Sequence, residues 1–530
     1  MKEVIKNNLD SIDDLFVSRL IKINIGINRE IYRNVVCKLI SEELAHYYYF
    51  LNISKRNNVS HEKMIFDYRL KKIDRLLHLM SHKKIKLSLS IFIETLISKL
   101  ILIFLLLNLI KNFLFNSKVL TQSKYKYIIR AYNAGFNLET HPKLDWMVDS
   151  VNIKNNEVLI LKEDKLSSRF DSTLSKKYEN YEAEKFSYIW TGGKKDFLSF
   201  LFNNVKIILP LFFKNFFPIG NGLTVLPQIF LNHFRWSSVL QNVKSEYFIS
   251  YHDHGISHIL RNHYLMKSHI KSIHYKHTHA ENVFSTSDNG YRPLYSYMNY
   301  DMEIHWSNIS VIQSKSSNSG SKNYFISGPL WLKKSKRQWK NDNLNVIFYP
   351  TSHGNPGSIN DDEDHLSFLE TALSLVEDNS IKSVFFKPKH HFKSYFISDN
   401  KNLRKLSKKL NENEKFIILD FNNEVSSYID EIDISIHLPF SSSFLSTLFS
   451  GIRSFYFDPN NKYPNAIYNK LDGMVYSEKK GFRKAMIHNK KMTKEDFDNK
   501  FLEISKEFFL IDNFHFNSKK VFHEALNKLD

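Results

Sequence analysis

From Val243 onward, short apolar runs alternate with helical patterns, and this alternation constrains the fold more than any other feature. The runs are rich in β-branched and aromatic residues, as buried strands are. Strands separated by helical segments of roughly 10 to 15 residues pair in parallel, with the helices covering the sheet. We therefore predict an α/β fold. The predicted strands are 247–251, 271–275, 324–327, 345–349, 383–387, 416–419, 432–438 and 453–457.

The chain of 530 residues is long enough for several domains. Gly328 and Pro329, followed by a basic segment, separate two groups of predicted strands, and we place a domain junction there. We expect a helical N-terminal region at 1–120, an acceptor domain at 121–330 and a nucleotide-donor domain at 331–530. The helical expectation comes from apolar residues three and four positions apart before residue 80.

Two apolar stretches interrupt the N-terminal half. Residues 87–110 are nearly all apolar but contain Glu94 and Lys99, and residues 197–217 combine many phenylalanines with lysine. A spanning helix needs about 20 apolar residues with few charges, and a central glutamate is costly in it, so the first stretch is either a membrane-inserted or membrane-lying helix or a buried core helix. Apolar residues beside lysine suit an anionic membrane surface. Burial in a core or between domains is the alternative for both stretches.

The charge balance indicates an anionic partner. Lys and Arg number 74 against 55 Asp and Glu, which gives a net charge of +19. A hydrophobic content of 42% excludes a disordered tail. The single cysteine, Cys37, excludes an intrachain disulfide and fits a reducing compartment. The first 20 residues lack the pattern of a secretory signal.

The turn after the predicted strand 432–438 is the first candidate for ligand binding. Ser441, Ser442 and Ser443 precede apolar residues at helical spacing, so a helix is predicted to begin at the serines. The first amides of a helix are unpaired and carry the positive end of its dipole, and open α/β sheets bind ligands at this edge. Added hydroxyls favour a phosphate site. Ordinary capping by serine is the alternative.

A basic turn follows the predicted strand 383–387. Pro388 fixes the chain there, so Lys387 or Lys389 and His390 are expected to project at the same edge of the sheet as the serines. Lysine neutralises a diphosphate, and imidazole can donate a hydrogen bond to it. A solvated basic loop is the alternative.

A polar turn follows the predicted strand 345–349. Thr351, Ser352 and His353 come directly after it, and we assign them to the donor side as well. The acidic run 361–364 comes next. Its simplest explanation is favourable charge in the first turn of a helix.

Histidines follow the predicted strand 247–251. His252, Asp253 and His254 come directly after it, and Gly255 permits a tight turn and close approach of a ligand. A histidine here could take a proton from an acceptor hydroxyl while Asp253 orients it. More histidines follow up to position 279, but their spacing matches no familiar ligand set, so we expect no metal. Structural or surface histidines are the alternative.

The order of these turns resembles that in the GT-B glycosyltransferases, over about residues 243–473. The likeness is greatest to the branch with CDP-glycerol glycerophosphotransferases and capsule or lipopolysaccharide sugar transferases. The segments that carry it are YHDHG, a strand ending in Gly-Pro, IFYPTSHG, FFKPKHH, IILD, DISIHLPFSSS and FYFDP.

This resemblance implies two Rossmann-like domains that face each other across a cleft. It places the His-Gly turn 254–255 on the acceptor side as the source of the base. Lys387, His390 and the serines 441–443 match the donor pyrophosphate cradle. The order Lys-Pro-Lys-His-His displaces His390 by one position from the family's pattern. His252 offers a second histidine where the pattern has one.

We expect a metal-independent glycosyltransferase that uses a nucleotide-sugar as substrate and needs no cofactor. The expected acceptor is a capsule or lipopolysaccharide glycan, free or lipid-linked, and the expected location is cytoplasmic, peripheral on the inner face of the membrane. A CDP-polyol phosphotransferase of the teichoic-acid type and a non-enzymatic basic protein that binds nucleic acid or membrane are the alternatives. The aromatic residues lie in apolar runs, which argues against nucleic acid. The donor sugar, the stereochemical outcome, the linkage and the oligomeric state cannot be predicted from the sequence.

Overall fold

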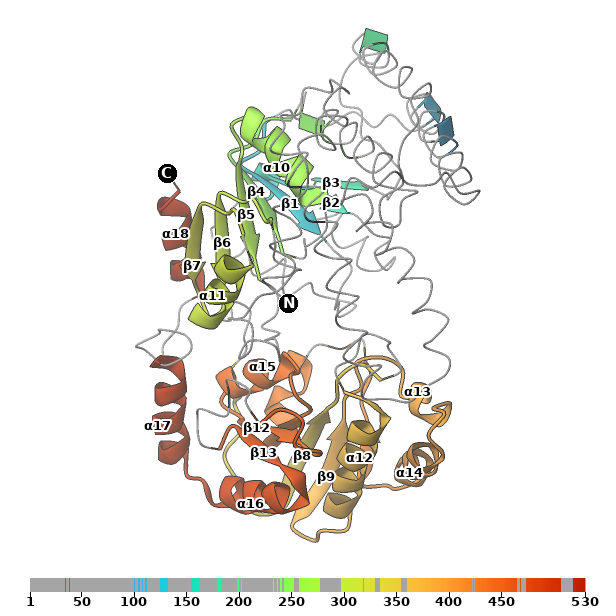
Figure 1. Ribbon diagram of the computed structural model, residues 1–530. Helices are drawn as coiled ribbons and strands as arrows, with labels where there is room; N and C mark the ends of the chain where they lie inside the picture. The colour runs from blue at the N-terminus through green and yellow to red at the C-terminus, as the bar shows by residue number, and fades with distance from the viewer. Residues whose placement is uncertain are drawn as a thin grey trace, which may run out of the picture.

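The computed structural model describes two sheets and the helices around them. The described residues, apart from isolated positions elsewhere, are 124–131, 154–162, 179–182, 243–251, 257–276, 297–317, 319–328, 334–353, 360–421, 425–464, 473–506 and 518–529. Figure 1 shows the first sheet above the second.

The first sheet has seven parallel strands in the order β3-β2-β1-β4-β5-β6-β7. These are β1 (Tyr127–Ala131), β2 (Val158–Lys162), β3 (Glu179–Glu182), β4 (Tyr247–Ser250), β5 (Lys271–Tyr275), β6 (Met302–His305) and β7 (Asn323–Ile326). Helix α10 (Ser257–Lys267) connects β4 to β5, and α11 (Asn308–Ser316) connects β6 to β7. A short 3-10 turn, η1 (Asn155–Glu157), precedes β2.

The second sheet has six parallel strands in the order β10-β9-β8-β11-β12-β13. These are β8 (Leu344–Tyr349), β9 (Ile381–Phe386), β10 (Phe416–Ile418), β11 (Ile434–His437), β12 (Arg453–Asp458) and β13 (Val475–Ser477). Both sheets therefore have the strand order of a Rossmann fold.

Helices and 3-10 turns surround the second sheet. They are α12 (Asp362–Val376), α13 (Lys393–Phe396), α14 (Lys401–Asn411), η4 (Val425–Ser427), η5 (Ile429–Glu431), α15 (Ser443–Phe449), α16 (Glu478–Lys491) and α17 (Lys494–Ile504). The acidic run begins α12 as predicted, because Asp361 caps the helix and accepts a hydrogen bond from the Asp364 amide.

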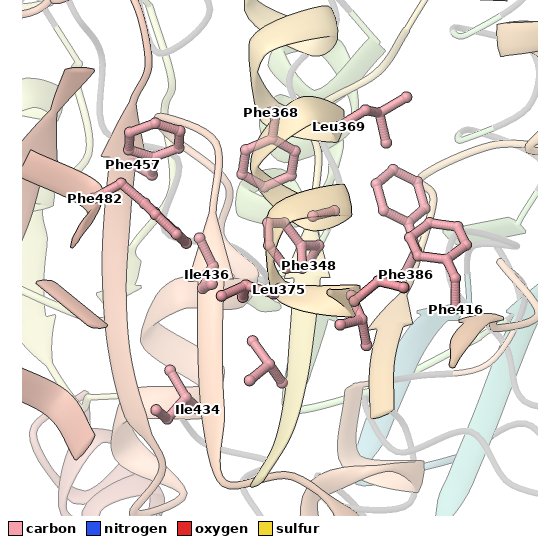
Figure 2. Close-up of a cluster of buried hydrophobic side chains, with 14 of the residues drawn as sticks. Phe348, Phe368, Leu369, Leu375, Phe386, Phe416, Ile434, Ile436, Phe457 and Phe482 are labelled. Atoms are coloured by element: carbon pink, nitrogen blue, oxygen red, sulfur yellow. The ribbon is translucent and has the colours of Figure 1, made fainter. Parts of the chain in front are cut away.

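One face of the second sheet is covered by a hydrophobic core. Side chains at alternate strand positions, such as Phe348 and Ile436, pack against Phe368 of α12 and Phe482 of α16 (Figure 2). Successive residues of a strand point to opposite faces. The residues between the core positions, such as Tyr349 and His437, therefore lie on the other face of the sheet.

The last helix returns to the first sheet. In α18 (Ser518–Asn527), Phe522 and Leu526 belong to the buried cluster that contains Ile129 and Ile249. Figure 1 shows α18 beside β7. The range 331–530 that we expected to form the donor domain therefore includes one helix that packs on the other domain. The exact domain limits stay a prediction.

The two domains contact each other at the carboxyl ends of their strands. Trp306, directly after β6, and Ile309 of α11 belong to the same buried cluster as Phe440, Phe444 and other residues of the second domain. Figure 1 shows α11 facing α15. The predicted fold class, two Rossmann-like domains that face each other, is confirmed.

All eight predicted strands exist. The structure also contains strands that were not predicted from the sequence, and β6 is one of them. Glu303 and His305 interrupt its apolar pattern, yet both are fully buried. The Nζ atom of Lys276 lies 3.6 Å from Glu303 Oε2, and His305 Nε2 lies 3.2 Å from the same oxygen. Burial alone would raise the pKa of Glu303, but Lys276 and His305 hold that pKa well below its usual range.

The two apolar stretches are described only in part, like the predicted helical region 1–120. Most of their described apolar residues are exposed, and Ile110 is partly exposed. Within the described residues, the structure has no helix of the length and apolarity that a membrane crossing needs. The exposed residues are Leu100, Ile103, Phe104 and Leu107 of the first stretch and Leu198 and Phe202 of the second.

Candidate functional site

The second sheet has a topological switch point between β8 and β11. From β8 the chain continues to β9 on one side, and from β11 it continues to β12 on the other. The crossover helices therefore diverge and leave a crevice at the carboxyl ends of β8 and β11, where such folds bind ligands. The segments that follow these two strands are 350–353 and 438–442.

Four side chains form a row across the carboxyl ends of the strands. The register pairs His437 of β11 with Tyr349 of β8 and with Tyr456 of β12. The Lys387 amide, directly after β9, donates to the Phe348 carbonyl at 3.0 Å, which places Lys387 beside Tyr349. Neighbouring strands lie about 4.8 Å apart, so the Cα atoms of Lys387 and His437 are separated by roughly 10 Å.

His437 holds the serine turn. Its Nδ1 lies 3.0 Å from Ser443 Oγ, and its Nε2 lies 2.9 Å from Ser435 Oγ and 3.1 Å from Thr447 Oγ1. The ring stacks on that of Tyr349, with centroids 4.8 Å apart. Burial lowers the pKa of His437 well below its usual range, so the imidazole is neutral. It fixes the position of the Ser443 hydroxyl without adding a charge.

Helix α15 begins at the serines as predicted, but it begins without a capping hydrogen bond from the N-cap side chain. Ser442 is the N-cap residue and its side chain makes no capping hydrogen bond. The hydroxyls of Ser441 and Ser443 are hydrogen-bonded to each other. Among the described residues, the Ser442 hydroxyl has no hydrogen-bond partner, and all three serines are partly exposed. Ser442 is therefore able to donate to a ligand.

Asn360 joins the turns that follow β8 and β11. Its amide Nδ2 donates to Thr351 Oγ1 at 3.0 Å and to the Pro439 carbonyl. The Tyr463 hydroxyl, in the turn after β12, donates to Asn360 Oδ1 at 3.4 Å. Asn360 is 4% exposed, so these bonds fix the floor of the crevice away from water. Asn360 and His437 were not predicted from the sequence, because a single polar residue beside a turn shows no pattern.

His353 points to the helices and is fully engaged there. Its Nε2 lies 3.1 Å from Asp362 Oδ1, its Nδ1 lies 3.3 Å from Ser394 Oγ, and its ring stacks on Tyr395 at 4.3 Å. The hydrogen bond from His353 lowers the pKa of Asp362. His353 therefore ties the turn after β8 to α12 and α13. Its predicted donor-binding role is not supported by these contacts. Ser352, beside it, is buried.

The basic turn after β9 lies at the edge of the row. Lys387 Nζ donates to the Phe421 carbonyl at 3.1 Å, and its side chain is partly exposed. Lys389 and His390 are exposed. The sequence prediction that Lys387 and the serine turn share one edge of the sheet therefore agrees with the geometry.

The predicted acceptor-side residues His252, Asp253, His254 and Gly255 lie outside the described residues. They follow Tyr251 at the end of β4 in the sequence. In the first sheet the switch point lies between β1 and β4, since β1 pairs with β2 on its other side.

One protein family matches a long part of the chain that contains the candidate site. Residues 439–442 read Pro-Phe-Ser-Ser, and residues 207–486 match the family of polysaccharide biosynthesis PFTS motif proteins. The chain belongs to this family. The match spans more than half of the chain and includes β4 to β13.

Several solved structures are similar to this chain at low identity. The Arabidopsis thaliana protein UGT89C1 in complex with UDP-L-rhamnose is 12% identical, with a TM-score of 0.44 over 77% of this chain and 100% of its own. The lipopolysaccharide outer core galactosyltransferase WaaB is 11% identical, with a TM-score of 0.41 over 76% of this chain and 99% of its own.

A third similar structure is not a transferase. A putative UDP-N-acetylglucosamine 2-epimerase from Listeria monocytogenes is 10% identical, with a TM-score of 0.42 over 76% of this chain and 95% of its own. A search of curated proteins found no match. Because these likenesses are weak, the fold of the PFTS family member is assigned from its sheet topology.

Proposed function

We propose that this PFTS family member is a glycosyltransferase that moves a sugar from a nucleotide-activated donor to a surface glycan. One observation carries the proposal: Lys387, the histidine-held serine turn and the Ser442 hydroxyl share the carboxyl edge of the second sheet at its switch point. A cation and hydroxyl donors in such a crevice suit the diphosphate of a nucleotide-sugar. Membership of a polysaccharide biosynthesis family supports the choice of a glycan as acceptor.

In this proposal the protein stabilises the leaving group by charge and hydrogen bonds. As the bond between the sugar and the diphosphate breaks, negative charge grows on the phosphate oxygens. In the proposed reaction Lys387 neutralises this charge and the hydroxyls of Ser441 and Ser442 donate hydrogen bonds to it, as fixed donors do most effectively in a crevice with little water. The proposed reaction uses no divalent ion. Lys389 and His390 are proposed to contact the outer part of the donor.

The acceptor is proposed to bind on the first domain. His254 or His252 would take the proton of the acceptor hydroxyl, and Asp253 would orient the histidine. The product is a lengthened glycan, and the nucleoside diphosphate leaves from the second domain.

We propose a peripheral location on an anionic membrane surface, where a lipid-linked acceptor would be found. The exposed residues Leu100, Phe104, Leu107 and Phe202 support this proposal. Exposed apolar side chains in a protein with a net charge of +19 suit insertion beside anionic headgroups.

The test is a donor-consumption assay with two separate pools. One pool holds UDP-, GDP- and CDP-linked sugars, and the other holds CDP-linked polyols, each supplied with glycan acceptors. We expect consumption of a nucleotide-sugar and its loss in the variant Ser441→Ala/Ser442→Ala. Consumption of the CDP-polyol pool alone would indicate a phosphotransferase instead of a glycosyltransferase. Equal turnover by wild type and variant would refute the site.

A further inference from the structure

A wide groove lies between α16 and α17, on a part of the second domain that the proposed reaction does not use. Its volume is about 990 Å³. Six basic residues line it, against two acidic ones, Asp496 and Glu503. Figure 1 shows the two helices at the lower left, with α16 at the end of the domain farthest from the first sheet. The basic lining residues are Lys480, Arg483, Lys484, His488, Lys491 and Lys500.

The basic residues of α16 that line the groove occupy one face of the helix. Relative to Lys480, the others are three, four, eight and eleven positions further along, which is the spacing of a single helical stripe. The opposite face carries Phe482, Ala485 and Met486, which are buried against the second sheet. The core therefore fixes which way the basic stripe points.

Three lysines on or near α16 form ion pairs that the lysines and the arginine of the stripe do not form with the described residues. Lys479 pairs with Glu370 at 2.9 Å, Lys490 with Asp378 at 2.9 Å and Lys494 with Asp498 at 2.6 Å. By contrast, four exposed cations of the stripe form no ion pair with any acidic residue that the structure describes. They are Lys480, Arg483, Lys484 and Lys491.

Uncompensated charge on one face has a cost. Lysines four positions apart on a helix, such as Lys480 and Lys484, repel each other and destabilise the helix. A bound polyanion would remove this repulsion and release its own counterions. We propose that the groove between α16 and α17 binds an anionic glycan chain, as a second site apart from the donor crevice. The choice of a glycan rests on the proposed function.

A membrane fits this surface less well. A helix that lies in a membrane surface needs a free apolar face beside its basic one. The apolar face of α16 is buried in the core, and Ile487 is the one large apolar residue of the groove that is strongly exposed, at 58%.

Single-stranded nucleic acid also fits less well. Such ligands stack their bases on exposed aromatic side chains. No aromatic residue is among those that line the groove, and Phe497 and Phe501 of α17 are buried. Asn499 and Glu503 on the α17 side offer acceptors for sugar hydroxyls instead.

The experiment measures binding of fluorescent oligogalacturonate, an anionic oligosaccharide, to the whole protein by anisotropy. We expect binding that weakens with salt, no binding of a neutral maltooligosaccharide, and at least a tenfold loss of affinity in Lys480→Gln/Lys484→Gln/Lys491→Gln. The matched control is Lys405→Gln/Lys408→Gln/Lys409→Gln on α14, which removes the same charge from another exposed surface. It should bind as the wild type does.

Three results would overturn the proposal. They are absence of oligogalacturonate binding, an equal loss in both triple variants, and tighter stripe-dependent binding of phosphatidylglycerol vesicles or of a single-stranded oligonucleotide. Donor consumption with a short neutral acceptor should be the same in the wild type and in the α16 variant. Oligogalacturonate binding is measured without any catalytic turnover. The experiment therefore distinguishes a wrong assignment of the groove from a wrong assignment of transferase activity.

Discussion

The Nδ1 atom of His437 lies 3.0 Å from Ser443 Oγ, and this bond joins the end of β11 to the start of α15. His437 is fully buried and all its polar contacts are to hydroxyls, so the ring is a neutral support for the serine turn. Ser443 in turn bonds to Ser441. The position of the serine hydroxyls therefore depends on one imidazole below them.

Two substitutions of His437 should distinguish the contribution of its Nδ1 contact from that of its Nε2 contacts. An asparagine amide can reproduce the Nδ1 contact to Ser443, whereas a glutamine amide reaches the Nε2 partners. We expect His437→Gln to lower kcat by roughly tenfold to a hundredfold, since small misplacements of positioning groups have effects of this size. His437→Asn should keep more of the activity. Steady-state kinetics with KM and kcat measured separately test this, and equal kcat values in the two variants would contradict it.

Asn360→Ala should destabilise the second domain. The Pro439 carbonyl would lose its amide donor in a place that water cannot reach, which costs about 1–3 kcal/mol. Urea unfolding followed by circular dichroism measures the change. The control is Asn402→Ala on an exposed face of α14, where no such loss is expected. A change below about 0.5 kcal/mol in Asn360→Ala would show that Asn360 does not hold the crevice together.

Stability should fall on mild acidification. Burial, with the charge of His353, lowers the pKa of His365 to about 3, while its value in the unfolded chain is about 6.5. Between these values the unfolded state binds the proton and the folded state does not, so stability falls as pH falls through this window. The slope is about 1.4 kcal/mol per pH unit for this histidine.

The neutral form of His365 accepts the Tyr395 hydroxyl hydrogen bond at Nδ1 over 3.0 Å, and the amide oxygen of an asparagine can accept it as well. His365→Asn should therefore flatten the fall in unfolding free energy between pH 6 and pH 4. Urea titrations at several pH values measure it. An unchanged slope in the variant would assign the acid sensitivity to other groups, such as His437.

Trp306→Ala should uncouple the two domains. Trp306 belongs to the first domain but lies in a cluster built mainly from the second, and removing a buried tryptophan costs about 3–5 kcal/mol. We expect faster hydrogen exchange in α15 and separate unfolding transitions. Trp339→Ala, within the second domain, should destabilise without separating the transitions. A single shared transition in Trp306→Ala would contradict the coupling.

The regular parts of the fold could be predicted because their residues follow one periodicity. Strands such as β8 and β11 are apolar runs bounded by polar turns, and the helix after the serines has apolar residues at helical spacing. The strand β6 was missed because its Glu303 is neutralised by Lys276, a partner that is distant in sequence. Local patterns contain no information about such partners.

The candidate site could be predicted only in part for the same reason. Turns at the carboxyl ends of parallel strands must meet at one edge, so the sequence order alone brings Lys387 near the serines. It does not show that His353 is engaged by Asp362, or that Asn360 reaches the Pro439 carbonyl. These depend on side-chain directions, which the packing of α12 against the sheet determines.

Calorimetric titration with nucleoside diphosphates tests the central claim most directly. We predict that at least one of UDP, GDP and CDP binds the wild type, and that Lys387→Ala and Ser442→Ala each weaken its binding by roughly tenfold or more, the scale of a lost hydrogen bond to a charged group. Lys382→Ala, an exposed lysine at the other end of β9, should bind as the wild type does. Binding of equal strength in all four proteins, or no binding by the wild type, would contradict a donor site at this edge of the sheet.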